Sequence, residues 1–105
     1  MTNEIALRET DFDVPEGDFA KKAFFPNGYG ISVIRHYGSY GYKSGLFECV
    51  VIRGTEEDWY IDVSVLHGDV LGWQTPADVV AYARKIAQLP HTSEALENGS
   101  VHVIE

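Results

Sequence analysis

The chain has 105 residues, with 16 acidic and eight basic side chains and a formal net charge of −8. This length suits one hydrophobic core, and a hydrophobic share of 45% excludes wholesale disorder. No apolar run approaches the roughly 20 residues that span a bilayer, and the N-terminus lacks the basic start and apolar core of a signal peptide. We therefore expect one cytoplasmic domain with no membrane association.

The charge is unevenly distributed along the chain. Residues 1–20 contain six acids and one base, residues 21–53 contain five bases and one acid, and residues 54–105 contain nine acids and two bases. A chain that is acidic on average is repelled by phosphate backbones, so direct nucleic-acid binding is not expected. A local basic patch within residues 21–53 stays open.

Residues 1–20 are expected to form an acidic, weakly ordered arm, because acids recur there and Pro15 and Gly17 interrupt any regular pattern. The α+β domain is assigned to residues 21–90. Residues 91–105 are assigned to a tail that either adds a short edge strand or trails free. The alternative for the arm is an extended edge segment, part of which lies over the core through Ile5, Leu7, Phe12, Val14 and Phe19.

Three segments predict β-strands. Residues 31–37 follow a Pro-Asn-Gly turn signal and are rich in β-branched and aromatic side chains. Residues 46–53 are almost continuously apolar, which is typical of a central strand covered on both faces. Residues 58–66 alternate, and short connections favour an antiparallel meander. The alternation predicts one buried face of Trp59, Ile61, Val63 and Val65, with Asp62 and Ser64 on the other face.

Residues 75–89 predict an α-helix. Thr75 provides an N-cap hydroxyl, a proline and an acid follow in the first turn, and Pro90 ends the segment. The expected fold is therefore α+β, a three-stranded antiparallel meander with a C-terminal helix packed on one face. The helix should bury the apolar residues that recur at helical spacing, Val79, Tyr82, Ala83, Ile86 and Leu89.

The sequence contains no assembled catalytic or metal-binding motif. Its four histidines lack the spacing of paired metal ligands, and the best local pair, His67 with Asp69, is explained more simply as part of a polar loop. Cys49 lies in an apolar run, where a thiol is a poor nucleophile. The serines lack a nucleophile elbow, and the glycine-rich stretches lack the Lys-Ser/Thr of a phosphate loop. No catalytic residue, metal ligand or cofactor is therefore predicted.

The most distinctive stretch is residues 35–43, which combine aromatic rings, two bases and flexible glycines. Tyrosine and arginine in loops are favoured at protein recognition surfaces, because they give contact area and hydrogen bonds at modest entropic cost. The alternative is a hairpin loop whose tyrosines pack back on the sheet. We predict a protein-binding site formed by Arg35, Tyr37, Tyr40, Tyr42 and Lys43.

Roughly residues 24–89 resemble small proteins encoded by bacteriophages and prophages. The resemblance lies in the PNGYG motif at residues 26–30, the GLFE motif at residues 45–48, and the VLGW motif at residues 70–73 that leads into Thr75. It brings no catalytic or binding residue to carry over. What it implies is a phage accessory protein in a bacterial cytoplasm, a setting in which binding to a host protein is expected.

Two functions of different classes follow from these observations. The first is a non-enzymatic protein-interaction module with a host or phage partner, which uses the loop at residues 35–43 and leaves homo-oligomerisation open. The alternative is an acidic decoy that inhibits a host nucleic-acid-processing or defence enzyme, which would use the acids of the arm and of residues 56–69. A small hydrolase or transferase would require a deep pocket lined by perturbed histidines or carboxylates.

Overall fold

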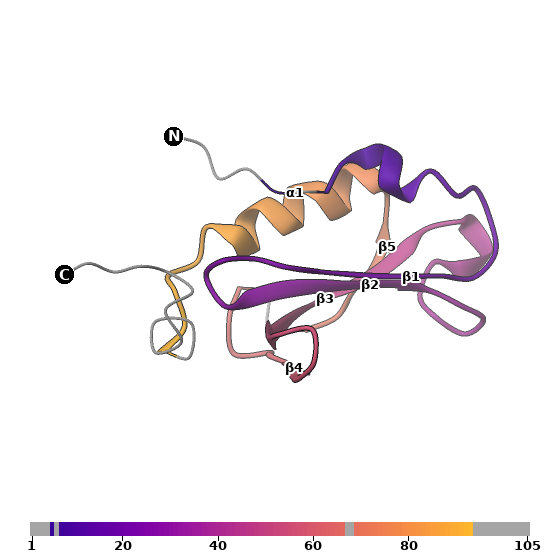
Figure 1. Cartoon of the computed structure of the whole chain (residues 1–105). Coiled ribbons are helices and arrows are strands. Elements are labelled where there is room, and N and C mark those ends of the chain that lie inside the picture. Colours follow the sequence, from indigo (N-terminus) through magenta and orange to yellow (C-terminus); the bar gives the residue numbers. More distant parts are fainter. Residues whose placement is uncertain (1–4, 6, 67–68, 94–105) are drawn as a thin grey trace.

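The computed structural model describes residue 5, residues 7–66 and residues 69–93. This part of the chain forms an antiparallel five-stranded sheet with one α-helix and two short 3-10 helices. Helices α1 and η1 lie on the same face of the sheet (Figure 1). The strands are β1 (Phe19–Phe24), β2 (Tyr29–Arg35), β3 (Phe47–Gly54), β4 (Trp59–Ile61) and β5 (Leu71–Gln74), and the helices are η1 (Glu9–Phe12), η2 (Tyr42–Ser44) and α1 (Pro76–Ala87).

Strand β3 is the centre of the sheet. It pairs with β2 along one edge, and its other edge is shared by β4, which pairs with residues 52–54, and β5, which pairs with residues 47–49. The α+β class, the antiparallel pairing and the central place of residues 46–53 are therefore confirmed. The prediction of three strands was incomplete, because β1 and β5 also join the sheet. Both are short segments without a strong alternating pattern.

The predicted strand over residues 58–66 is wrong beyond Ile61. The side chain of Asp62 turns back on the chain, and its Oδ1 accepts a hydrogen bond from the Ser64 backbone N–H at 2.9 Å, which ends β4. Asp62 is buried, at 7% exposure, whereas Trp59 is 38% and Ile61 52% exposed. Ile61 pairs with Ile52 at the sheet edge and is exposed, so the expected core position is also wrong.

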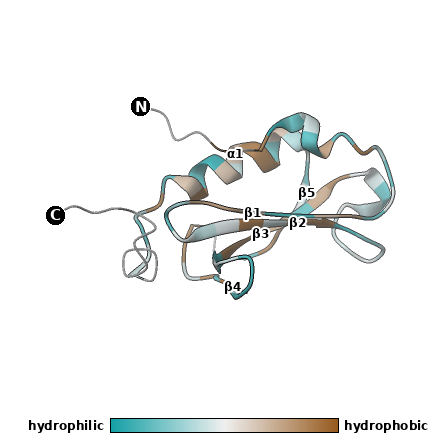
Figure 2. Ribbon diagram, viewed as in Figure 1, coloured by the Kyte–Doolittle hydropathy of each residue, from teal (hydrophilic) through white to brown (hydrophobic). Residues whose placement is uncertain are grey.

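The predicted helix is confirmed as α1. Thr75 and Asp78 form a reciprocal capping box, in which the Asp78 backbone N–H donates to the Thr75 hydroxyl at 3.1 Å and the Thr75 N–H donates to the Asp78 carboxylate at 3.0 Å. Hydrophobic residues gather along α1, β2 and β3, whereas the turn before β4 is hydrophilic (Figure 2). The predicted inward residues Val79, Tyr82, Ala83 and Ile86 are buried, and Leu89 is half-buried against the core.

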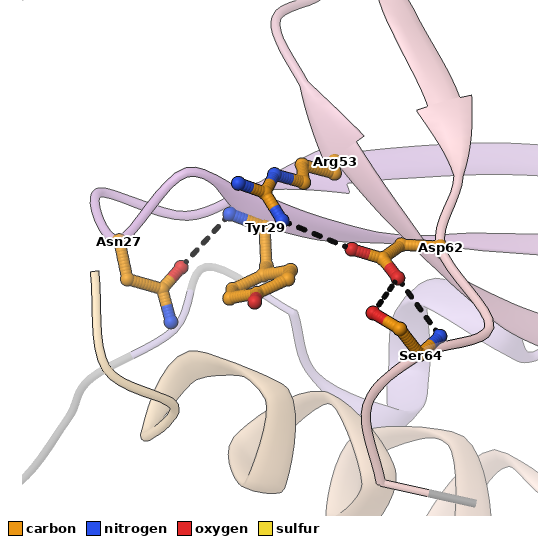
Figure 3. A network of polar contacts seen from close by, with 5 residues as sticks. All are labelled: Asn27, Tyr29, Arg53, Asp62 and Ser64. Atoms are coloured by element: carbon orange, nitrogen blue, oxygen red, sulfur yellow. Dashed lines mark hydrogen bonds and ion pairs between the residues drawn. The ribbon is translucent and has the colours of Figure 1, made fainter. Parts of the chain in front are cut away.

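The turn between β1 and β2 holds the C-terminal end of α1. The buried Asn27 amide donates to the carbonyl oxygens of Ile86 at 2.8 Å and of Leu89 at 3.0 Å. Its Oδ1 accepts from the Tyr29 backbone N–H at 3.0 Å (Figure 3). Carbonyl groups in the last turn of a helix have no partner within the helix, so Asn27 supplies partners that the helix itself cannot.

Part of the N-terminal segment packs into the core. Leu7 and Phe12 are 4% and 1% exposed, and the rings of Phe12, Phe19 and Phe47 have centroids 5.1–5.7 Å apart. This placement is the one described by the alternative reading of the arm, and β1 begins within the predicted arm at Phe19. The predicted edge strand at the end of the tail, and His67, lie outside the described residues.

Candidate functional site

The connection between β2 and β3 is a series of tight turns with a defined shape. Backbone hydrogen bonds join Ser39 N to His36 O at 2.8 Å, Tyr42 N to Ser39 O at 3.2 Å, and Leu46 N to Gly41 O at 2.9 Å. Gly41 has φ +92°, in the left-handed region that favours glycine. The glycines that looked like a source of flexibility therefore allow a fixed loop geometry.

A β-bulge in β5 places Trp73 beside this loop. Phe47 pairs with Gln74 and Cys49 pairs with Leu71, so four residues of β5 stand against three of β3. Trp73 lies in the irregular part, has φ +59° and is 60% exposed. A large aromatic side chain in the left-handed region is strained, and such strain gathers at functional sites. Bulges also re-aim side chains, as this one does for Trp73.

The loop and β5 approach closely because two glycines leave room for them. A Cβ atom at Gly72 would lie 2.4 Å from the Tyr40 Cβ, and one at Gly41 would lie 2.9 Å from the Leu46 Cβ and 3.2 Å from the Trp73 Cα. The distances of 2.4 Å and 2.9 Å between Cβ atoms are too short for a side chain at either glycine without a shift of its neighbours. The absence of a side chain at Gly72 thus lets Tyr40 lie directly against β5.

The loop between β2 and β3 and the bulge of β5 together form a hollow of about 300 Å³. Tyr37 and Tyr40 are 81% and 63% exposed, and the rings of Tyr37 and Tyr42 meet edge to face with centroids 6.0 Å apart. The hollow brings together four of the five predicted binding residues. We call it the aromatic hollow, and its lining is Tyr37, Gly38, Ser39, Tyr40, Gly41, Tyr42, Lys43 and Trp73.

Arg35 differs from the expectation that it contacts a partner, because its side chain is fully buried. The Arg35 Nε donates to the Gly17 carbonyl at 2.7 Å, Nη1 donates to the Gly45 carbonyl at 2.9 Å, and the guanidinium stacks 4.6 Å from the Phe47 ring centroid. Strand β2 alternates, and Arg35 falls on the same face as the buried residues Ile31 and Val33. Arg35 therefore supports the loop from within.

A second hollow of about 340 Å³ adjoins the aromatic hollow. It lies where the N-terminal segment crosses the end of η2, at the two carbonyl groups that Arg35 holds. Tyr42 and Lys43 line both hollows and so form a ridge between them. We call it the acidic hollow, because Glu16 is part of its lining, which consists of Pro15, Glu16, Gly17, Tyr42, Lys43, Ser44 and Gly45.

A polar network beside the turn after β4 has a structural role. Arg53 and Asp62 form an ion pair at 3.3 Å, and Ser64 donates to Asp62 through both its backbone N–H and its hydroxyl (Figure 3). Burial alone would raise the pKa of Asp62, but the hydrogen bonds from Ser64 and the charge of Arg53 outweigh burial and lower that pKa. The carboxylate is thus held ionised as the anchor of the turn after β4.

Cys49 lies in surroundings that suppress the reactivity of its thiol. Burial, followed by the charges of Asp78 and Glu48, raises the pKa of the Cys49 thiol to about 12, so the thiolate is scarce at neutral pH. Among the described residues, no group of three or more histidine, cysteine or acidic side chains is placed to hold a metal ion. Within the same part of the chain, no helix is long and apolar enough to cross a membrane.

No family model, curated protein or solved structure matches this chain significantly. The candidate site is therefore argued from its geometry alone. Sequence reasoning missed Trp73 as a site residue, although the Gly-Trp pair in the VLGW motif was a usable signal. A glycine beside an aromatic residue, at a point where no alternating pattern continues, is typical of a bulge.

Proposed function

We propose that this chain is a non-enzymatic protein-interaction module that binds its partner through the aromatic hollow. The observation that carries the proposal is the exposure of Tyr37, Tyr40 and Trp73 around one concave surface of fixed geometry. Rigid aromatic side chains in a preformed hollow gain contact area on binding at a small entropic cost. On the resemblance to phage-encoded proteins, we place this activity in a phage accessory protein of the bacterial cytoplasm, with a host or phage protein as partner.

The acidic-decoy alternative finds less support in the arrangement of charges. Imitation of a nucleic-acid backbone calls for a continuous track of acids, since phosphates follow one another at regular short distances. The acids of residues 9–13 lie in and directly after η1, on the α1 side of the sheet. Those of residues 56–58 lie in the turn between β3 and β4, on the opposite side of the sheet (Figure 1). The two groups therefore do not share one face.

Site-specific photocrosslinking in bacterial cells tests the proposal. A benzophenone amino acid at Tyr37, the most exposed ring of the aromatic hollow, should yield a discrete adduct with one protein. The matched control carries the same group at Tyr60, which is 53% exposed on β4. The Tyr37 adduct should disappear when Trp73→Gly is added. Equal adducts at both positions, or an adduct that is indifferent to Trp73→Gly, would contradict the proposal.

A further inference from the structure

The two hollows form one extended site with different chemistry at each end. The aromatic hollow presents three tyrosine rings and one indole, with Lys43 as its charged residue, whereas the acidic hollow adds Glu16, a serine hydroxyl and backbone groups to Tyr42 and Lys43. Because Tyr42 and Lys43 line both, a ligand that crosses this ridge can occupy both hollows at once. Resting on the proposed function, this layout specifies the kind of partner segment that the site accepts.

The backbone form of the ligand follows from what the site offers. A ligand strand would require an unpaired strand edge to continue the ladder, but the hollows are lined mainly by turn residues, together with Trp73 of the bulge. A polyproline II segment needs no ladder. It has three residues per turn, a rise of about 3.1 Å per residue and no internal hydrogen bonds, so its carbonyl groups are free to accept from tyrosine hydroxyls and an indole N–H.

Aromatic rings also match the side chains of such a segment. Flat exposed rings pack against pyrrolidine rings, and proline loses little conformational entropy on binding because it is already restricted. Recognition of a cation by the rings is disfavoured, since Lys43 lines the aromatic hollow and no acidic residue among its lining residues offsets that charge. The neutral proline ring is therefore the side chain that fits the aromatic hollow best.

The charge around the acidic hollow determines which side chain suits the other end of the ligand. Glu16 lines it, and Asp13 and Asp18 are close in sequence on either side. All three acids belong to exposed residues. Two bases offset them: Lys43, which lines the hollow, and the buried Arg35, which donates to the Gly17 and Gly45 carbonyl groups of the same lining. The three acids outnumber these two bases, so the hollow favours a basic side chain over an acidic one.

We infer that the partner presents a proline-rich, polyproline II segment with an arginine or lysine at one end, and that its prolines occupy the aromatic hollow while the basic residue meets Glu16 in the acidic hollow. The ridge of Tyr42 and Lys43 separates the two parts of the segment. A proline-rich segment without the basic residue binds more weakly, and so does one with an acidic residue in its place.

The test uses two synthetic peptides with a Pro-x-x-Pro core, one with arginine at its N-terminal end and one with arginine at its C-terminal end, titrated against the full chain by calorimetry. One of them should bind, and replacement of its arginine by glutamate should weaken binding about tenfold or more, which corresponds to roughly 1.4 kcal/mol. Glu16→Lys should reproduce that loss. Trp73→Gly should abolish binding without unfolding the chain, because glycine accepts the backbone angle that strains tryptophan.

A random-peptide display on the same immobilised chain separates failure of this inference from failure of the proposed function. Enrichment of proline-rich peptides with a basic end, lost with Trp73→Gly, supports the inference. Enrichment of Trp73-dependent peptides without proline overturns it and leaves the interaction module standing. If no peptide depends on Trp73, both are contradicted. Binding of the Pro-x-x-Pro peptides that persists with Trp73→Gly would also overturn the inference.

Discussion

Removal of the Asn27 side chain should destabilise the domain more than any substitution at an exposed position. Asn27→Ala eliminates two hydrogen bonds from the amide to the end of α1 and one from the Tyr29 N–H, all at a side chain that is 3% exposed. At about 1 kcal/mol for each hydrogen bond, the free energy of unfolding should fall by roughly 3 kcal/mol. For a domain of this size, that loss corresponds to a melting temperature lower by roughly 10–25 °C.

A second variant, Asn27→Asp, tests the contacts of the amide group with α1 separately from the contact with Tyr29. It keeps the acceptor for Tyr29 but turns a negative charge towards the carbonyl oxygens of Ile86 and Leu89, at the negative end of the helix dipole. It should therefore cost at least as much as Asn27→Ala at neutral pH. Urea denaturation followed by circular dichroism measures both variants, with the exposed Gln88→Ala as the control. A loss below about 1 kcal/mol for Asn27→Ala would refute the capping role, because three hydrogen bonds at a buried side chain predict more.

Three further outcomes are expected. Ile52→Ala should lower the free energy of unfolding by about 2–5 kcal/mol, because Ile52 is fully buried. Ile61→Ala, at the position that pairs with Ile52 but is half-exposed, should lower it by about 1 kcal/mol or less. Equal losses for the two variants in urea denaturation would contradict this prediction. Asp62→Asn should destabilise the chain at neutral pH. Because folding lowers the pKa of Asp62 from 3.8, the stabilisation by its carboxylate is complete above that value and is lost as the pH falls through the folded pKa. If Asp62→Asn destabilises the chain as much at acid pH as at neutral pH, the prediction is wrong. Gly72→Ala should displace Tyr40 and weaken peptide binding in calorimetry, and an unchanged affinity would contradict the close contact.

The elements that the sequence predicted well are those with strong local signals. The helix has a capping box and helical periodicity, and residues 46–53 form a short apolar run, rich in β-branched residues, that favours a central strand. The strand over residues 58–66 failed for a specific reason. Its alternation is equally compatible with a short edge strand followed by a turn, and the hydrogen bonds of Asp62 with Ser64 and Arg53 decide between them.

The sequence predicted the three tyrosines and Lys43 of the candidate site, but not the buried position of Arg35 or the contribution of Trp73. Arg35 was assigned to the binding surface because it begins the tyrosine-rich stretch of residues 35–43, whereas the backbone carbonyl groups of Gly17 and Gly45 hold it inside. Trp73 was missed because its exposure depends on a bulge against β3, which is a tertiary feature. The proximity of Glu16 to Lys43 likewise depends on the crossing of the N-terminal segment over η2.

The most direct test of the central claim is an NMR titration of the ¹⁵N-labelled chain with the tightest peptide from the display. The backbone amides of residues 37–43 and the indole N–H of Trp73 should show the largest chemical-shift changes, with smaller changes at Glu16 and Gly17. The indole of Trp59, which lies 4.7 Å from the Lys22 ammonium, serves as the internal control and should not move. Shifts centred on Trp59 and the other β4 residues, with Trp73 unaffected, would contradict the assignment of the aromatic hollow as the binding site.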